Sequence, residues 1–199
     1  MIMKAIPGAT FAFVACIAAA SPNSFVAVAL EEPRWVFDPG VYVASRNKFT
    51  VKMPAGWLQM DLSEGGNLHV LASRDGPLLQ VINCQRLSVP EFAGTEGSLD
   101  LQSMLPEELA DLLVARISRM LQLQNLEVIE NRPAVLGGAP AFRLLIDYRG
   151  IGNIRYRSLI YGALSKQSVF IMSYTAPTIW YFDRHLRDFD ETVKTFQIG

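Results

Sequence analysis

Three arginines in the last third of the chain have the side chains best suited to bind a charged ligand. Arg143, Arg155 and Arg157 lie in two neighbouring segments whose apolar and polar residues alternate, as in half-buried β-strands. Gly150 and Gly152 lie between the segments and favour a hairpin turn. The hairpin places all three guanidinium groups on one face of a sheet. There they could bind an anionic ligand or an acidic partner, because guanidinium groups form strong hydrogen bonds with such groups.

A structural role is the commoner alternative for these arginines. If Tyr148 pairs with Ile154 in the hairpin, Asp147 lies directly opposite Arg155. Opposite charges that face each other across neighbouring strands are ordinary in antiparallel sheets. The cluster could therefore serve the fold alone.

Two aromatic residues extend the candidate surface. Trp180 and Tyr181 lie outside the apolar stripe expected in the last helix. Exposed aromatic side chains are typical of protein interfaces. The candidate interaction residues are therefore Arg143, Arg155, Arg157, Trp180 and Tyr181.

Residues that could catalyse a reaction are few. The histidines His69 and His185 stand alone in the sequence and have no metal-ligand spacing. His185 lies off the apolar stripe of the last helix, so we expect it in solvent. His69 could orient Ser173 or Cys84 as the nucleophile of an esterase or peptidase, but no Gly-x-Ser-x-Gly turn accompanies them. We expect no catalytic residue, no metal ion and no cofactor.

The N-terminal residues 1–29 are typical of a secretory signal peptide. A short basic start at Lys4 precedes an apolar run, and small residues allow cleavage after Ala20 or Ala29. The run is shorter than the ~20 apolar residues of a membrane-spanning helix. We therefore expect an exported protein of the periplasm or cell envelope, without a transmembrane helix in the mature chain.

The two cysteines of the sequence have different expected roles. Cys16, preceded by Phe13-Val14-Ala15, resembles a bacterial lipoprotein box, so a lipid anchor there is an alternative to cleavage. Cys84 lies in an apolar strand and is expected to be a small buried side chain. With the leader removed, no internal disulfide can form, and the core alone must stabilise the domain.

Composition and length limit the class of protein. Hydrophobic residues make up 50% of the chain and charged residues 19%, which is typical of a globular domain. The net charge of −1 lacks the basic excess of a nucleic-acid-binding protein. Residues 30–199 are long enough to bury one core, so we expect a single domain.

The candidate surface must be positioned by the segment 139–196, which reads as a three-stranded meander followed by a helix. Pairing Tyr148 with Ile154 and Tyr161 with Val169 would place the even-numbered residues of all three strands on one apolar face. Pro177 is expected in the first turn of the helix. The apolar stripe of that helix consists of Ile179, Phe182, Leu186, Phe189, Val193 and Phe196.

The other expected elements are short strands and one more helix. Strands are expected at 34–38, 41–44, 49–53, 68–73, 78–87 and 126–130, and a helix is expected from Leu105 to Leu121. Hairpin signals dominate and no strand–helix–strand alternation occurs. The sequence therefore predicts an α+β fold in which helices flank an antiparallel β-sheet on both faces.

Four short motifs resemble the PsbP-like and DcrB-like superfamily. They are Phe49-x-Val51-x-Met53-Pro54-x-Gly56-Trp57, Gly137-Gly138-Ala139-Pro140-Ala141, Tyr174-x-Ala176-Pro177 and a closing Thr195-Phe196. The resemblance implies an antiparallel sheet with helices on both sides. It also implies non-enzymatic roles: members attach to photosystem II, occur as periplasmic or lipid-anchored envelope proteins, or bind a small GTPase. No metal-binding or partner-binding motif of the family matches this chain.

These observations favour an exported, non-catalytic accessory protein that binds an unidentified envelope protein. A periplasmic carrier of an anionic or amphipathic small ligand, held between sheet and helix, is the second hypothesis. The hydrolase that would use His69 is the third.

Overall fold

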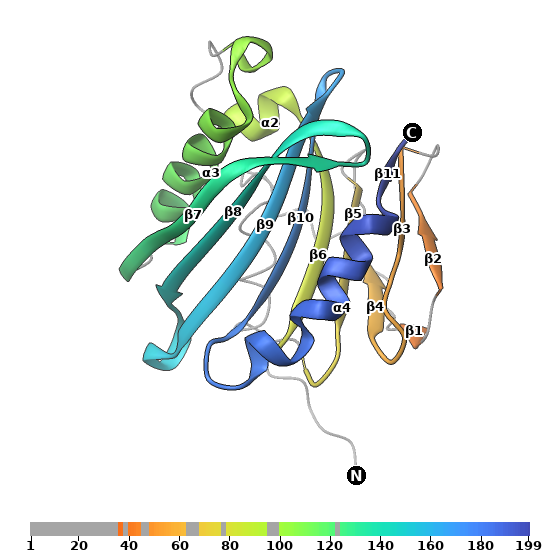
Figure 1. The fold of residues 1–199 in the computed structure, drawn as a ribbon, viewed down its shortest axis with the longest axis vertical. Coiled ribbons are helices and arrows are strands. Elements are labelled where there is room, and N and C mark those ends of the chain that lie inside the picture. The colour runs from red at the N-terminus through yellow and green to blue at the C-terminus, as the bar shows by residue number, and fades with distance from the viewer. Residues whose placement is uncertain are drawn as a thin grey trace, which may run out of the picture.

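The computed structural model describes residues 36–37, 40–44, 48–62, 68–76, 79–94, 100–121 and 124–199. Figure 1 shows the arrangement of the elements. The expected signal peptide, with Ala20, Ala29 and Cys16, lies outside the described residues. Within the described ranges, no helix combines the length and hydrophobicity needed to cross a membrane.

Antiparallel β-sheet dominates the fold, as the sequence predicts. The large sheet has eight strands in the order β1-β4-β5-β6-β10-β9-β8-β7, and a small sheet has the order β11-β3-β2. The strands are β1 Val36–Phe37, β2 Val41–Val43, β3 Phe49–Lys52, β4 Leu58–Asp61, β5 Leu68–Ser73, β6 Val81–Ser88, β7 Gln124–Leu136, β8 Ala139–Arg149, β9 Arg155–Ser165, β10 Ser168–Pro177 and β11 Gln197–Ile198. The helices are α2 Val89–Ala93, η4 Leu101–Ser103, α3 Pro106–Leu121, η5 Ile151–Asn153 and α4 Tyr181–Thr195.

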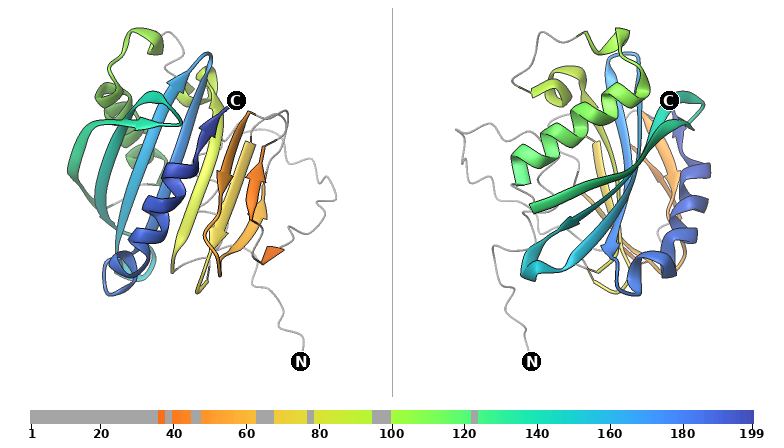
Figure 2. Two further views of the ribbon diagram at one scale, coloured as in Figure 1. Left: turned by 45° about the vertical axis from the view of Figure 1, so that its right-hand side comes forward. Right: turned by 60° about the vertical axis from the view of Figure 1, so that its left-hand side comes forward.

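Alternate residues of β10 divide the core into two clusters. Phe170 and Met172 belong to the cluster that includes Phe182 and Phe189 of α4, and we call this side of the sheet the α4 face. Val169 and Ile171 belong to the cluster that includes residues of α2 and α3, and this side is the α3 face. Figure 2 shows α3 and α4 with the large sheet between them.

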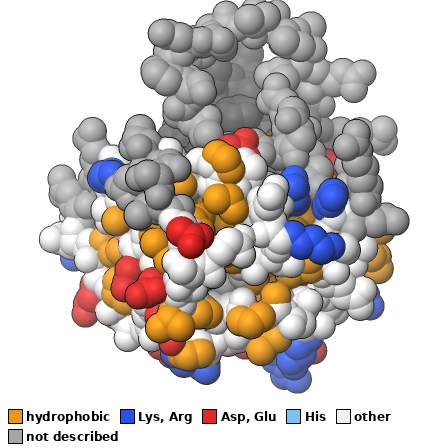
Figure 3. All heavy atoms as spheres, turned by 90° about the horizontal axis from the view of Figure 1, so that it is seen from above, with side chains coloured by type: hydrophobic (Ala, Val, Ile, Leu, Met, Phe, Trp, Pro, Cys, Tyr) orange, Lys and Arg blue, Asp and Glu red, His pale blue; other side chains and the backbone are white. Residues whose placement is uncertain are grey.

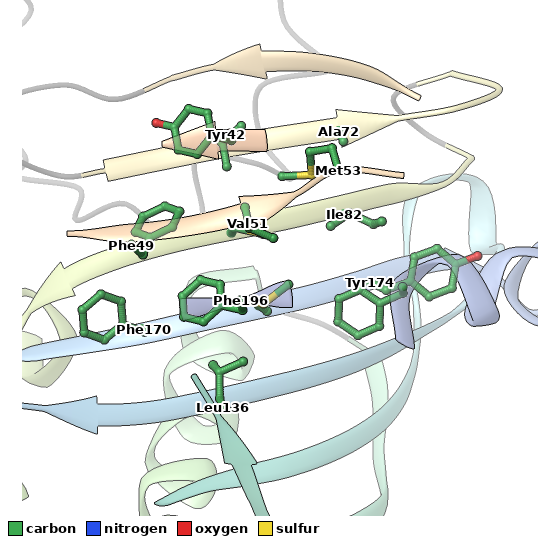
Figure 4. Close-up of a cluster of buried hydrophobic side chains, with 14 of the residues drawn as sticks. Tyr42, Phe49, Val51, Met53, Ala72, Ile82, Leu136, Phe170, Tyr174 and Phe196 are labelled. Carbon is green, nitrogen blue, oxygen red and sulfur yellow. The ribbon is translucent and has the colours of Figure 1, made fainter. Parts of the chain in front are cut away.

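The small sheet closes the core on the α4 face. Figure 4 shows aromatic side chains from distant parts of the chain packed together there. The rings of Phe49 and Phe196 stack with their centroids 5.4 Å apart, and Phe170 meets Phe49 edge-on at 6.4 Å. Phe49, Val51 and Met53 alternate into this core, which explains why the first motif spaces its apolar residues by two.

The registers of β8 with β9 and of β9 with β10 both differ from the expected ones. Tyr148 pairs with Tyr156 instead of Ile154, a shift of two residues that keeps every side chain on its face. Tyr161 pairs with Met172 instead of Val169, and this shift of three residues exchanges the faces of β10. The cause is a turn of only two residues after Ser165, in which Lys166 takes a φ of +56°. The prediction that even-numbered residues of all three strands share a face is therefore wrong.

The last helix begins later than expected. Pro177 still belongs to β10, where it pairs with Tyr156, and α4 starts at Tyr181. Trp180 takes a φ of +70°, which turns the chain from the strand into the helix. Ile179 therefore precedes the helix and is 77% exposed, so its assignment to the buried stripe is wrong.

The strand β7 is more than twice as long as expected, because its tight turn to β8 extends the pairing to Leu136. Gly137 and Gly138 both have positive φ at this turn. A Cβ at Gly137 would lie 2.9 Å from the Ile198 side chain. The glycine pair of the second motif therefore serves both the turn and close packing against the C-terminus.

Candidate interaction surface

Asp147 joins two of the three predicted arginines in one ion-pair network. Its carboxylate accepts hydrogen bonds from Arg157 Nε at 2.6 Å and Arg157 Nη2 at 2.9 Å, and Arg155 Nη2 lies 2.8 Å from its Oδ2. The Asp147 side chain is only 2% exposed. The hydrogen bonds from Arg157 lower the pKa of Asp147, and those to Asp147 raise the pKa of Arg157. The network therefore neutralises the buried Asp147 carboxylate within the sheet.

Asp147 lies opposite Arg157 in the sheet, not opposite Arg155. The two-residue shift of the β8–β9 register is the cause. Arg155 pairs with Arg149 and reaches Asp147 from the neighbouring position on the same face. The Arg155 side chain stays 51% exposed, and Glu127 lies 3.7 Å away. Arg155 is thus the arginine of this network that solvent and a partner reach most easily.

Arg143 forms a separate group on the same face. Its Nε donates to the Tyr161 hydroxyl at 3.1 Å, and its guanidinium forms an ion pair with Glu130. Glu130 also accepts from Arg132 Nε at 2.8 Å. Burial disfavours the charged form of Arg143, but the hydrogen bonds to Glu130 and Tyr161 outweigh it and raise its pKa. Three residues of β8 lie between Arg143 and Asp147, and Arg143 pairs with Glu130 instead of Asp147, so the three arginines do not form one binding group.

The loop between β10 and α4 presents large apolar side chains to solvent. Ile179 is 77% exposed and Trp180 is 64% exposed. The loop is fixed, because Thr178 N donates to Arg155 O at 2.9 Å and the Thr178 hydroxyl donates to the same oxygen at 3.2 Å. Figure 1 shows this loop at the lower end of the sheet, beside the turn from β8 to β9.

A cation–π contact orders the exposed tryptophan. The Arg184 guanidinium lies over the Trp180 ring, with Cζ 4.2 Å from the ring centroid. We define the Trp180 surface as Arg155, Ile179, Trp180 and Arg184. Arg184 was not among the residues singled out in the sequence. Its position one helical turn after Trp180 is the signal that could have found it.

Tyr181 contributes mainly to the core. It packs against the cluster on the α4 face, and its backbone oxygen accepts a hydrogen bond from the Tyr174 hydroxyl at 3.0 Å. Its ring meets the Trp180 ring edge-on at 5.3 Å. Tyr181 therefore packs between the core and the Trp180 ring, and the tryptophan is the more exposed of the two.

The prediction that His185 lies in solvent is wrong. His185 is 6% exposed, and its Nδ1 lies 3.1 Å from Asp188 Oδ2. The same carboxylate oxygen accepts from Trp57 Nε1 at 3.2 Å. The buried residues of α4 are Phe182, His185, Phe189 and Thr192, a face rotated from the expected stripe because the helix also packs against Trp57. His185 and Asp188 thus hold α4 against Trp57, which lies in the segment that follows β3.

The nucleophiles considered for a hydrolase are unfavourably placed. Cys84 is fully buried among the residues of the α4 face, and burial raises the pKa of its thiol far above the ordinary value. Ser173 is also buried and lies on the opposite face of the sheet, between Met172 and Tyr174 of the α4 face. The side chain of His69 is outside the described atoms. In the described ranges, no three His, Cys, Asp or Glu residues are arranged to hold a metal ion.

The end of the sheet opposite the Trp180 loop lies at the β9–β10 turn. Figure 3 views the molecule from above, at the end where the β9–β10 turn lies. Among the coloured atoms, acidic and basic side chains are both interspersed with apolar ones.

Comparison with known proteins reveals the fold. No family model matches the sequence. No curated protein matches it either. The solution structure of cyanobacterial PsbP (CyanoP) from Synechocystis sp. PCC 6803 aligns with 80% of this chain and 91% of its own, with a TM-score of 0.58 and 12% identity. The Ran-binding protein Mog1p of Saccharomyces cerevisiae aligns with 83% of this chain and 96% of its own, with a TM-score of 0.53 and 11% identity. The resemblance inferred from the motifs is confirmed at the level of the fold: the chain has the PsbP-like fold that these structures share.

Proposed function

We propose that the chain is a non-catalytic accessory protein that binds another protein through the Trp180 surface. The observation that carries this proposal is that Ile179 and Trp180 are exposed on a loop that hydrogen bonds hold in place. A rigid apolar anchor loses little conformational entropy when it binds. Tryptophan and arginine are also the residues most enriched at the energetic centres of protein interfaces.

The backbone of Trp180 supports a role for the exposed side chain. A φ of +70° is unfavourable for a bulky residue and costs about 1 kcal/mol or more. Glycine would avoid this cost at the same position. In this conformation the backbone fixes the direction in which the Trp180 ring projects from the surface. This favours a contact role over a purely structural one.

The charges around the anchor indicate the chemistry of the partner. Arg155 is half-exposed beside the loop, and Arg184 is exposed against the tryptophan ring. A complementary partner would offer an apolar pocket for Ile179 and Trp180 with carboxylates at its rim. The fold is compatible with such a role, because the yeast protein of the same fold is a Ran-binding protein.

We infer the place of action from the N-terminal residues of the sequence. The leader at 1–29 supports export of the domain 30–199 to the periplasm or cell envelope, with Cys16 as the alternative lipid attachment point. Mass spectrometry of the protein from its own cells would test this. A mature N-terminus at residue 21 or 30, or a lipid on Cys16, is expected, and an unprocessed Met1 terminus would contradict export.

Paired variants test the binding surface. The full chain with Ile179→Ser and Trp180→Ala should lose a partner that the wild-type chain retains. Val135→Ala is the matched control, because Val135 is also large, apolar and 65% exposed but lies on β7. The control should retain the partner, with unchanged melting temperatures for both variants. Equal retention by the double variant and the wild type would refute the proposed surface.

A further inference from the structure

The strand β7 forms one edge of the large sheet. It spans Gln124–Leu136 and is the last strand in the order β1-β4-β5-β6-β10-β9-β8-β7. The strand β8 pairs with one side of β7, and in the described part of the chain no strand pairs with the other side. Figure 2, right, shows β7 in front of the other strands of the sheet, with α3 and α4 on either side. An edge strand of this length leaves backbone donors and acceptors that can pair with another strand.

Apolar side chains are also exposed along this edge. Val128 and Ile129 are each 44% exposed, and Val135 is 65% exposed. The neighbouring strands β8, β9 and β10, all of which are described, carry no comparably exposed large apolar side chain. Apolar groups that gather on a surface are typical of interaction sites. The strand β7 therefore differs from its neighbours in both its backbone and its side chains.

Two prolines show which backbone groups of β7 point away from β8. Facing residues of antiparallel strands alternate between hydrogen-bonded and non-hydrogen-bonded pairs. Proline has no N–H and is confined to positions that do not donate to the ladder. Pro133 pairs with Phe142, and Val135 pairs with Pro140. Both are therefore non-hydrogen-bonded pairs, and the backbone groups of Asn131, Pro133 and Val135 point outward.

The charges of β7 suit a second copy of the same strand. Glu130 and Arg132 flank Asn131 and lie on the α4 face, where Glu130 forms ion pairs with Arg132 and with Arg143. Two antiparallel copies of β7 with their Asn131 residues opposite each other would place Glu130 of each copy opposite Arg132 of the other. The Arg132 side chain is 57% exposed and that of Glu130 is 34% exposed, so both remain accessible to a second copy. Opposite charges that face each other across strands are stabilising.

Other alignments of the two strands are less favourable. A shift of the two-fold axis by one residue would place Glu130 opposite Glu130 or Arg132 opposite Arg132, and facing like charges are destabilising. An axis at Pro133 would bring together two residues that have no N–H to donate. With the axis at Asn131, the two Asn131 residues can exchange backbone hydrogen bonds, and Ile129 lies beside Pro133 of the other copy.

We infer that the chain forms a two-fold symmetric dimer in which β7 pairs antiparallel with β7 of a second copy, with Asn131 at the centre. A two-fold interface uses the same surface of both copies, so it requires a self-complementary segment. The strand β7 meets this requirement in its charges, its apolar side chains and its outward backbone groups. The opposite edge strand β1 spans only Val36–Phe37 in the described chain, which is too short for such pairing and limits further growth.

The expected dimer is weak. Pro133 lacks the N–H that would continue the ladder, and an irregularity between Val128 and Glu130 interrupts it on the other side of Asn131. An interface of so few residues is smaller than that of a stable complex, so we expect a Kd of about 10 to 100 μM. The inference is independent of the proposed function, because the Trp180 surface contains no residue of β7.

Sedimentation velocity of the purified full chain tests the inference directly. Between about 1 μM and about 500 μM protein, the average mass should rise from that of a monomer toward that of a dimer and not beyond it. Trp180→Ala should associate as the wild type does, which separates this interface from the Trp180 surface. A monomer throughout the range, or loss of the dimer in Trp180→Ala, would overturn the inference.

Charge reversal tests the expected register. Arg132→Glu places a carboxylate opposite Glu130 of the other copy at two symmetric positions, so the dimer should weaken about ten-fold or more. Lys194→Glu is the matched control, because Lys194 is 68% exposed and ion-paired with Glu191 on α4, and it should dimerise as the wild type does. A mixture of Arg132→Glu and Glu130→Arg chains should form a mixed dimer, since both facing pairs then join opposite charges again. Should Glu130→Arg fail to fold, Arg132→Glu decides alone.

Cysteine variants test which residues face each other. Asn131→Cys should form a disulfide-linked dimer under mild oxidation, because the two copies of residue 131 meet at the two-fold axis. Val135→Cys is the matched control, since its two copies would lie roughly 27 Å apart along the strands. The native Cys84 is buried and does not compete. The inference is overturned if Arg132→Glu dimerises as tightly as the wild type, or if Asn131→Cys forms no more linked dimer than Val135→Cys.

Discussion

Two buried regions of the large sheet, one around Asp147 and one around Asn83, treat their polar groups in opposite ways. On the α4 face, the buried Asp147 carboxylate has partners in both Arg155 and Arg157. On the α3 face, Asn83 and Gln85 each retain an unpaired buried atom. The difference teaches that a buried charge must be neutralised within the fold, whereas a neutral polar atom can stay unpaired at a smaller cost.

Removing the carboxylate should have the largest effect on stability. Asp147→Ala leaves two guanidinium groups without their shared partner beside the core, so the free energy of unfolding should fall by about 3 kcal/mol. Urea denaturation of both proteins measures this difference. Glu191→Gln is the control, because Glu191 forms only an exposed pair with Lys194, and its unfolding curve should overlay that of the wild type. An Asp147→Ala unfolding curve that overlays the wild-type curve would show that the network contributes nothing to stability.

Acid should remove the same contribution without a mutation. Hydrogen bonds from Arg157 hold the pKa of Asp147 below its value in the unfolded chain. Its stabilisation is therefore complete above about pH 4, the ordinary carboxyl range, and is lost as the pH falls through the lowered pKa. The stability difference between wild type and Asp147→Asn should shrink progressively below about pH 4. Unfolding curves across this range measure it, and a difference that stays constant would contradict the assigned charge state.

Replacing an unpaired amide should have the opposite sign. Asn83→Leu removes an unsatisfied buried atom, so the free energy of unfolding should stay equal or rise by about 1 kcal/mol. Ser158→Ala is the comparison, because Ser158 is hydrogen-bonded to Thr175 and its loss should be destabilising. Thermal unfolding of both variants tests the contrast. A clear loss of stability in Asn83→Leu would mean that the Asn83 side chain makes polar contacts that stabilise the fold.

The smallest effect on stability is expected at the Trp180 surface. Trp180→Ala loses the contact with Arg184 but removes little buried surface, because the Trp180 side chain is exposed. The free energy of unfolding should therefore change by less than about 0.5 kcal/mol. Trp180→Gly should be slightly more stable than Trp180→Ala, because glycine adopts the positive φ without strain. Differential scanning calorimetry can rank the three proteins. A large loss in either variant would assign the tryptophan to the core.

The sequence predicts those features that depend on local patterns. The alternation of Phe49, Val51 and Met53 predicts a strand with one buried face, and the structure places all three in the core. The glycines Gly150 and Gly152 predict the β8–β9 connection, where η5 lies. The placement of the three arginines on one face follows from that connection, because a shift of two residues does not exchange faces.

Features that depend on tertiary contacts could not be predicted. Lys166 has a positive φ that sets the β9–β10 register, and nothing about a lysine in the sequence predicts this conformation. The burial of His185 depends on Trp57, which lies far away in the sequence. The buried polar residues Asn83, Ser173 and Ser158 come from β6, β10 and β9, and they lie close together only in the final register.

Site-specific photocrosslinking is the most direct test of the proposed function. A photoreactive residue at position 179, in the cells that make the protein, should give a discrete adduct with one partner protein. The same residue at position 135, on the exposed side of β7, should not give that adduct. The adduct should disappear when Trp180→Ala or Arg184→Glu is added. No adduct at position 179, or the same adducts at both positions, would contradict a protein-binding role for the Trp180 surface.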